Sequence, residues 1–448
     1  TPTGSPTAEP TVRPSPTTPP TIAAGRWKGA GTLLWPRRAP AMVALGDGRV
    51  LVVGDEGGKY EGPPEQSRFA ELWNPRTGTW RETESLPAAR GRLAIIALRD
   101  GRALVAGGWN EKFVSYSSAY VYDGRTGRWT KTGLMGTART APAIAVLRDG
   151  RVLVAGGGYF TGLRTEAAAI DLAAYSGPAV GGADVRLADD WPGPDGRPLA
   201  TAELFDPATG QWTPTGPMRH AIWSGSAVTL RDGRVLISSV DPSYHPVLEV
   251  YDPAAGRFTT VATPSAPSPE VLTGLGVPSD VVGRLSPSDL GTVAALPNGD
   301  ALFVATRGSA SSGDDEYSVT RTLRLEPDRQ RWSDIGAPTV EYGRDVDGRW
   351  TVTTRGPRHP TGIAVALSDG RVLLAGGLDA SGDPSRHAEL LDPLNAEYVT
   401  LPRMPGARVD AVGVALRDGS ALVAGGWTNG GDGWPIALGD TFRFVPAR

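Results

Sequence analysis

LRDGRVLVAGG occupies residues 147–157, and close variants of this stretch recur along the chain. In each copy an Asp-Gly or Asn-Gly pair stands between two apolar runs, which is the pattern of a β-hairpin with a tight type I′ turn. The double glycine that often follows lets the backbone turn or pack closely where a side chain would clash. The seven copies are LGDGRVLVVGD from residue 45, LRDGRALVAGG from 98, LRDGRVLVAGG from 147, LRDGRVLISSV from 230, LPNGDALFVAT from 296, LSDGRVLLAGG from 367 and LRDGSALVAGG from 416.

A second hairpin motif follows the first, in which alternating apolar residues run into an Asp-Pro-x-x-Gly turn and then an aromatic residue. One repeat therefore holds four strands. Clear copies are AELWNPRTGTW (70–80), AYVYDGRTGRW (119–129), AELFDPATGQW (202–212) and LEVYDPAAGRF (248–258), whereas LRLEPDRQRW (323–332) and AELLDPLNAEY (388–398) have drifted.

The turn glycines Gly101 and Gly150 are 49 residues apart, which gives the length of the unit. A four-stranded unit of about 50 residues with a double glycine and a late tryptophan is typical of kelch repeats, and the Gly-His and Trp-Asp marks of WD40 blades are missing. Over residues 25–448 the chain resembles a kelch-type β-propeller, as in the propeller domain of galactose oxidase. We therefore expect an all-β, seven-bladed kelch-type β-propeller with four-stranded antiparallel blades.

The two ends of the repeat array predict how the ring closes. The last repeat stops at TFRFVPAR (441–448) and lacks its outer strand, whereas GRWKGAGTL (25–33) resembles GRWTKTGLM (127–135) but has no hairpin before it. Pairing the N-terminal strand with the last repeat would complete the seventh blade and protect an exposed edge. The aromatic residues that recur once per blade are expected to pack between blades: Trp27, Trp80, Trp129, Trp212, Phe258, Trp332 and Tyr398.

The composition limits the partners of the protein. A net charge of -3, from 45 Lys and Arg against 48 Asp and Glu, gives no basic field for nucleic acid or an anionic membrane. No apolar run is long enough to span a bilayer. Residues 1–24, TPTGSPTAEPTVRPSPTTPPTIAA, read as a disordered Thr/Pro-rich linker. We expect a monomer, secreted or tethered to the cell surface through this linker; the alternative is a tail without an anchor.

Interruptions of the repeat fall in the connections between the second and third strands and between successive blades. These connections emerge on one face, opposite the short Asp-Gly and Asp-Pro turns, as expected for functional loops on a rigid scaffold. The interrupted stretches are 158–199, 262–290, 305–319 and 336–361. The longest, 158–199, is either a lid containing a short helix or a disordered insertion.

An arginine recurs just before the first strand of six blades, at Arg38, Arg90, Arg139, Arg219, Arg358 and Arg408. Such a ring could bind a carboxylate or sulfate at one mouth of the central channel. The alternative is that each arginine hydrogen-bonds carbonyl groups of an adjacent blade, since a residue that recurs with a repeat often serves the fold.

Aromatic and histidine side chains add further candidates on the same face. Trp109, Tyr159 and Trp427 stand beside the glycine pairs and could stack on a sugar or peptide, or be buried against a neighbouring loop. The four histidines are His220, His245, His359 and His387. They share no metal-binding spacing, so we expect hydrogen-bonding histidines and no metal.

The resemblance carries a fold and not an activity. Galactose oxidase-like enzymes use a copper radical built on a tyrosine–cysteine crosslink, and this chain has no cysteine, so we expect no such cofactor. The leading hypothesis is a non-enzymatic binding propeller that recognises a glycan or protein, with a carboxylate or sulfate group, through the face with the long loops. The alternatives are a hydrolase, lyase or sugar isomerase that uses Arg, His and Tyr groups at the channel mouth, and a purely structural module.

Overall fold

The computed structural model describes twelve segments of the chain: residues 25–54, 67–163, 194–242, 246–263, 292–296, 300–312, 315–326, 331–335, 339–342, 362–377, 383–430 and 435–447. The linker 1–24, the central part of the 158–199 insertion with its expected helix, and the candidates His245, Arg358 and His359 lie outside these residues. Within them, no helix has the length and apolar character needed to cross a membrane.

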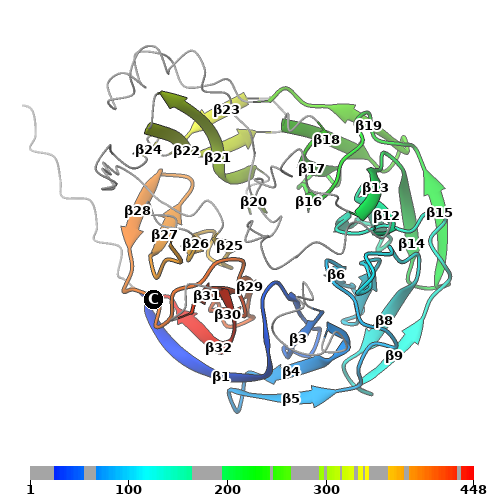
Figure 1. Cartoon of the computed structure of the whole chain (residues 1–448), viewed down its shortest axis with the longest axis horizontal. Helices are drawn as coiled ribbons and strands as arrows, with labels where there is room; N and C mark the ends of the chain where they lie inside the picture. Colours follow the sequence, from blue (N-terminus) through cyan, green and yellow to red (C-terminus); the bar gives the residue numbers. More distant parts are fainter. Residues whose placement is uncertain are drawn as a thin grey trace, which may run out of the picture.

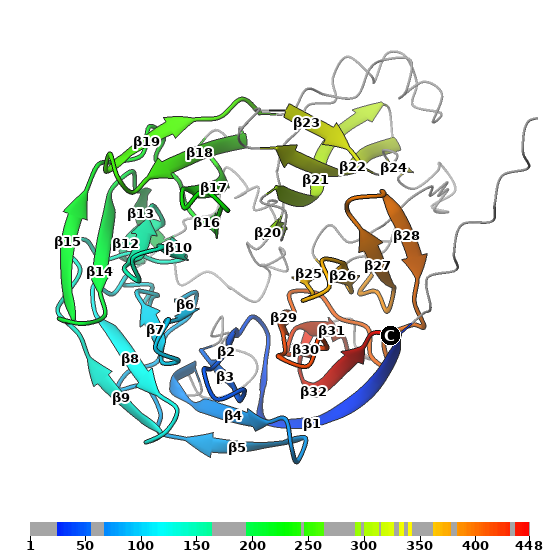
Figure 2. The same cartoon turned by 180° about the vertical axis from the view of Figure 1, so that it is seen from behind.

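Seven antiparallel four-stranded sheets form a closed ring (Figures 1 and 2). Blade 1 consists of β2 (Ala41–Ala44), β3 (Val50–Val53), β4 (Ala70–Asn74) and β5 (Thr79–Thr83). Blade 2 consists of β6 (Ala94–Ala97), β7 (Ala103–Ala106), β8 (Ala119–Asp123) and β9 (Arg128–Lys131). Blade 3 consists of β10 (Ala143–Val146), β11 (Val152–Ala155), β14 (Ala202–Asp206) and β15 (Gln211–Thr215). Blade 4 consists of β16 (Gly225–Thr229), β17 (Val235–Val240), β18 (Pro246–Asp252) and β19 (Arg257–Thr260).

Two of the remaining three blades, blades 5 and 7, carry an extra strand. Blade 5 consists of β20 (Thr292–Ala295), β21 (Ala301–Ser312), β22 (Asp315–Glu326) and β23 (Arg331–Asp334), with β24 (Thr339–Tyr342) on β22. Blade 6 consists of β25 (Ile363–Ala366), β26 (Val372–Ala375), β27 (Ala388–Asp392) and β28 (Glu397–Thr400). Blade 7 consists of β29 (Val412–Ala415), β30 (Ala421–Ala424), β32 (Pro435–Val445) and β1 (Arg26–Arg37), with β31 (Trp427–Asn429) on β32. The expected seven-bladed all-β propeller is confirmed.

The N-terminal strand closes the ring, as predicted. β1 pairs with β32 so that Trp27 lies opposite Phe444 (Figure 1). The innermost strands contact one another around the whole ring, and β29 of blade 7 contacts β2 of blade 1. Because closure leaves the seventh sheet with a complete outer strand, it removes the exposed edge that the sequence would otherwise leave.

The recurring outer aromatics pack between blades, and this prediction is also confirmed. Five indole N–H groups each donate to an acceptor in the preceding blade at 2.7–3.1 Å, as in Trp80 to the Thr441 hydroxyl and Trp212 to the Thr132 hydroxyl. The others are Trp27 to Pro402, Trp129 to Glu84 and Trp332 to Ala262. In blade 4 Phe258 is buried, and the neighbouring Tyr251 hydroxyl contacts Thr215 instead.

The Asp-Gly turns differ from the expected type I′. Gly48 has φ 86°, but Asp47 does not have a positive φ, and type I′ would require positive angles at both central residues. Gly48 N–H donates to the Leu45 carbonyl, and Leu45 N–H donates to Arg49. This is a three-residue loop with the glycine in the left-handed region. The Asp47 carboxylate accepts from the Arg49 backbone and replaces the missing turn contact.

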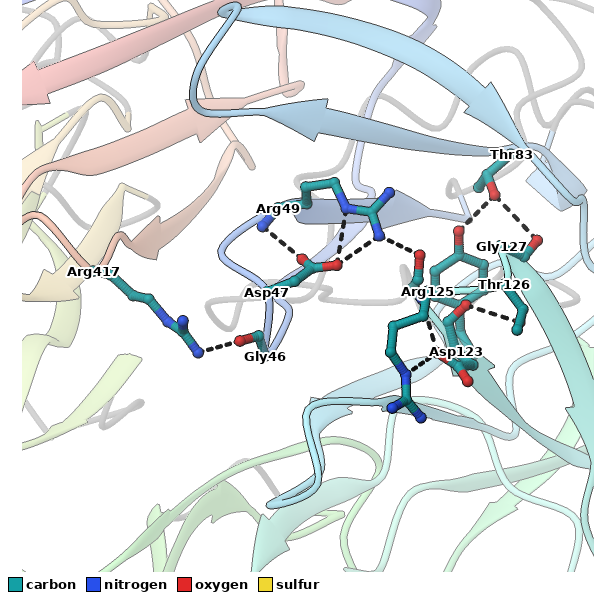
Figure 3. Close-up of polar contacts among 11 residues, drawn as sticks. Gly46, Asp47, Arg49, Thr83, Asp123, Arg125, Thr126, Gly127 and Arg417 are labelled. Carbon is teal, nitrogen blue, oxygen red and sulfur yellow. Dashed lines mark hydrogen bonds and ion pairs between the residues drawn. The ribbon is translucent and has the colours of Figure 1, made fainter.

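On this turn face, arginines that pair with the aspartate of their own turn also donate hydrogen bonds to carbonyl groups of the next blade. The Arg49 guanidinium donates to the Asp47 carboxylate at 2.9 Å, and it also donates to the Gly124 carbonyl group of blade 2 (Figure 3). Partial burial raises the pKa of Asp47, but the hydrogen bonds from Arg49 outweigh it and hold that pKa below its ordinary value. Arg102 and Arg371 reach Pro207 and Ala447 of the next blades in the same way.

In two blades the guanidinium beside the turn comes from another strand. In blades 5 and 7 the turn arginine is replaced by Asp300 and Ser420. Arg324 of β22 and Arg443 of β32 then supply the guanidinium, from equivalent positions opposite Leu302 and Leu422. Arg324 reaches the Pro393 carbonyl of blade 6, and Arg443 donates to Ser420 at 2.8 Å. In the other five blades that strand position is apolar: Leu72, Val121, Leu204, Val250 and Leu390.

Candidate functional site

The arginines before the first strands are buried within the blades. Arg139 is 0% exposed, and it donates to the carbonyl groups of Gly156 and Thr201 at 2.8 and 2.9 Å and to the Glu203 carboxylate at 2.8 Å. Arg90 and Arg408 make the corresponding bonds to Gly107 and Gly425, each 17 residues later in the chain. Burial lowers the pKa of all three, and Glu203 opposes this effect at Arg139.

The blade 1 member of this set is Arg37, and not the expected Arg38. Arg37 bonds to the Gly54 carbonyl, again 17 residues away, and to Glu71. Arg38 instead lies over the Trp427 ring, 5.5 Å from its centroid. The guanidinium groups of Arg37, Arg90, Arg139 and Arg408 therefore point into the blade whose first strand they precede, rather than toward an open mouth. These arginines serve the scaffold, as the alternative proposed, but their side chains bond to carbonyl groups of that same blade and not of an adjacent one.

The glycine pairs make room for these arginines in the next blade. A Cβ on Gly107 would lie 2.2 Å from the Arg139 carbonyl oxygen. The N–H of Gly108 donates to the same oxygen at 2.9 Å. Each arginine thus holds its own blade through its side chain and the preceding blade through its backbone, and any larger residue at Gly107 would separate the two blades.

Four aromatic rings meet on the face with the long loops. Phe160 of β12 (Gly158–Leu163) lies 5.1 Å from Trp109 and 5.5 Å from Trp223, measured between ring centroids. Phe113 contacts the Trp109 ring edge at 4.9 Å. We call Trp109, Phe113, Phe160 and Trp223 the aromatic platform. All four rings are partly exposed.

The backbone holds these rings together across blades 2, 3 and 4. Ser115 N–H donates to the Phe160 carbonyl at 3.0 Å, so the loop after β7 is joined to β12. β12 pairs with β13 (Pro194–Pro198), which places Phe160 opposite Gly196. A Cβ on Gly196 would lie 2.3 Å from the Phe160 ring, so only glycine lets the ring lie there. The described base of the 158–199 insertion is therefore a two-stranded ribbon that carries one ring of the platform.

Cationic side chains accompany the rings. Arg92 lies 5.5 Å from the centroid of Trp109 and has φ 49°, a strained backbone for a residue other than glycine. Tyr159 is on the opposite face of β12 from Phe160 and is covered by Arg197 at 5.4 Å. Trp427 is 8% exposed and donates to Asp410 at 2.8 Å. Of the three aromatics expected from the sequence, only Trp109 therefore belongs to the platform.

Two of the four histidines lie in the described residues, and each contacts a glutamate. The His220 Nδ1 atom lies 2.8 Å from Glu249, and the His387 Nε2 atom lies 3.2 Å from Glu389. The side chain of Arg219 is exposed, while its backbone N–H donates to Glu249 at 2.9 Å. The position in blade 4 that corresponds to the buried arginines is Ile222, so Arg219 stands three residues before it.

Sequence reasoning missed Phe113, Phe160, Trp223 and Arg92. No repeat marks these residues, because they lie in connections that differ from blade to blade. One available signal was the position of Phe160 next to Tyr159 in a stretch flanked by glycines, since alternation along a strand sends adjacent residues to opposite faces.

Comparison with known proteins identifies the fold. No protein-family model matches the chain, and a search of curated proteins finds no match. A solved structure, titled a novel fungal alcohol oxidase of the AA5 family in complex with copper, matches with a TM-score of 0.54 and 16% sequence identity. The match covers 95% of this chain and 77% of the oxidase chain. The chain adopts a galactose oxidase-like β-propeller. At this identity, the similarity shows the fold alone.

The described residues of this galactose oxidase-like propeller bring together no cluster of histidine and acidic side chains. Among them, no three His, Asp or Glu side chains come close enough together to hold a metal ion. The platform and its neighbour Arg92 carry side chains that are not copper ligands in proteins. The chain also has no cysteine for the crosslink of the copper-radical enzymes.

Proposed function

We propose that this protein is a binding propeller that recognises an acidic glycan through the aromatic platform. The observation that carries the proposal is the meeting of Trp109, Phe160 and Trp223, from three blades, on the face with the long loops. Partly exposed aromatic rings offer flat apolar faces to sugar rings, and the indole N–H groups of the two tryptophans can also donate hydrogen bonds.

The arginine beside the platform favours a carboxylate-bearing sugar. Arg92 lies over Trp109 in the segment that precedes β6, and a guanidinium pairs with a carboxylate through charge-assisted hydrogen bonds. A uronic-acid oligosaccharide would place its rings on the aromatic side chains and its carboxylates near Arg92. The Thr- and Pro-rich composition of residues 1–24 favours a secreted or surface-tethered setting for this binding.

Calorimetric titration with a galacturonate tetrasaccharide tests this function, with a neutral galactose tetrasaccharide beside it. We expect the acidic sugar to bind more tightly than the neutral one. Trp223→Ala should weaken binding of the acidic sugar at least about tenfold, which corresponds to ~1.4 kcal/mol. Trp35→Ala is the matched control, because Trp35 also stacks on a phenylalanine, Phe69 at 4.8 Å, but outside the platform.

Each outcome of this titration decides between the hypotheses. Equal weakening by Trp35→Ala and Trp223→Ala, or no binding of either sugar, would rule out a glycan site on the platform. Chromatography of the sugar after incubation shows whether it is cleaved or isomerised. Turnover would favour the alternative of a carbohydrate-active enzyme.

A further inference from the structure

Blade 4 differs from blades 1 and 3 in the side chain that hydrogen-bonds a buried carboxylate. In blades 1 and 3 the second residue of the third strand is a glutamate, Glu71 or Glu203, and both are buried. Each accepts two backbone N–H groups and one arginine, Arg37 at 3.0 Å or Arg139 at 2.8 Å. The arginine balances the charge that burial would otherwise leave unpaired.

Blade 4 retains this glutamate but not the arginine. Glu249 is 0% exposed and accepts the backbone N–H groups of Arg219 and His220 at 2.9 and 2.8 Å. Ile222 fills the arginine position and is buried. The third hydrogen bond comes from the ring of His220, through Nδ1 at 2.8 Å. A histidine with a 41% exposed side chain thus replaces a buried arginine.

This contact determines which nitrogen of His220 faces a ligand. A carboxylate only accepts hydrogen bonds, so Nδ1 must carry the hydrogen. In the neutral ring Nε2 is then a hydrogen-bond acceptor, and in the imidazolium form it becomes a second donor. Within the described part of the chain, Nε2 has no hydrogen-bond partner. A buried carboxylate that orients a histidine in this way fixes its tautomer, as it does around metal and catalytic sites.

The position of His220 links it to the aromatic platform. Trp223 follows three residues later in the same connection, and three residues span at most about 10 Å. The intervening Ile222 is bonded through its backbone to Leu199, next to the ribbon that carries Phe160. One oligosaccharide can therefore contact both the platform and His220.

We infer that His220 is a ligand-contacting, specificity-determining residue of this site, with Glu249 as its positioning residue. The inference rests on the proposed function and names the polar contact that accompanies the aromatic platform. Nε2 accepts a hydrogen bond from a sugar hydroxyl, and the imidazolium form donates to a uronic carboxylate.

Nitrogen-15 NMR of the imidazole rings tests the positioning. With four histidines in the chain, loss of one signal in His220→Gln assigns the ring. In the wild type we expect the Nδ1–H tautomer, and we expect Glu249→Gln to change it because a side-chain amide can also donate. Addition of the galacturonate tetrasaccharide should shift the Nε2 resonance of His220. A neutral wild-type ring with hydrogen on Nε2, or an Nε2 resonance that does not move while the sugar binds, would overturn the inference.

Binding measurements on variants distinguish a failure of this inference from a failure of the proposed function. His220→Gln should weaken binding of the galacturonate tetrasaccharide at least about tenfold and leave the melting temperature of the protein unchanged. His387→Gln, which alters the other described His–Glu pair, should not weaken it. If Trp223→Ala loses binding but His220→Gln retains it, the inference fails and the proposed function stands. If the wild type binds neither the acidic nor the neutral sugar, both fail.

Discussion

At the scale of single residues, a fixed spacing from the glycine pair distinguishes the arginines that stabilise the scaffold from residues that could contact a ligand. Arg37, Arg90, Arg139 and Arg408 each stand 17 residues before the glycine whose carbonyl they bind. This regularity was present in the sequence and would have selected Arg37 over Arg38. The burial of these side chains could not be read from it, because an arginine just before a strand can point outward or back into its own blade.

We predict that Arg139→Ala destabilises the protein and leaves glycan affinity in the folded fraction intact. The substitution leaves the buried Glu203 without its cation, a change that costs about 3–5 kcal/mol. Urea unfolding measures the loss. Arg219→Ala is the control, because the Arg219 side chain is exposed, and it should change the free energy of unfolding by less than about 0.5 kcal/mol. Unchanged stability of Arg139→Ala together with lost affinity would instead make Arg139 a ligand-binding residue.

At the scale of elements, the repeat predicted the strands and their pairing but not their exceptions. An Asp-Gly or Asn-Gly pair with an apolar run on each side predicts a hairpin, so all seven pairs of first and second strands could be located. The turn type could not, because the carboxylate of Asp47 stabilises a longer loop. The joining of β12 to the loop after β7 depends on two blades meeting in space, and no local pattern shows it.

In blade 7 the guanidinium comes from Arg443 of β32, while Ser420 stands at the turn position that carries arginine in other blades. This difference can be tested by a rescue experiment. Arg443→Leu removes the donor to Ser420 and Asp418, and Ser420→Arg crowds Arg443, so each change alone should lower the melting temperature. The double variant recreates the arrangement of blades 1 to 4 and should recover most of the loss. Urea unfolding of all four proteins gives the coupling free energy, which we expect at about 0.5–3 kcal/mol. Additive losses would show that the two positions do not substitute for each other.

At the scale of the whole molecule, the ring could be predicted because its two ends carry complementary parts of one repeat. Trp27 lies on β1, the outer strand of blade 7, and Phe444 lies opposite it on the neighbouring strand β32. The function could not be predicted in the same way, since one propeller fold hosts many activities. What distinguishes this propeller is local: the aromatic platform and the histidine in blade 4, both built where the repeat is interrupted.

Hydrogen–deuterium exchange with and without the galacturonate tetrasaccharide tests most directly which face of the propeller binds. The wild-type protein is used, so no substitution can disturb the fold. We predict slower exchange in the platform segments 91–92, 108–116, 158–163 and 219–224, with unchanged exchange in the turn segments 45–49, 98–102, 147–151 and 230–234. Protection of the turn segments with no change in the platform segments would contradict the account, because the ligand would then lie on the opposite face.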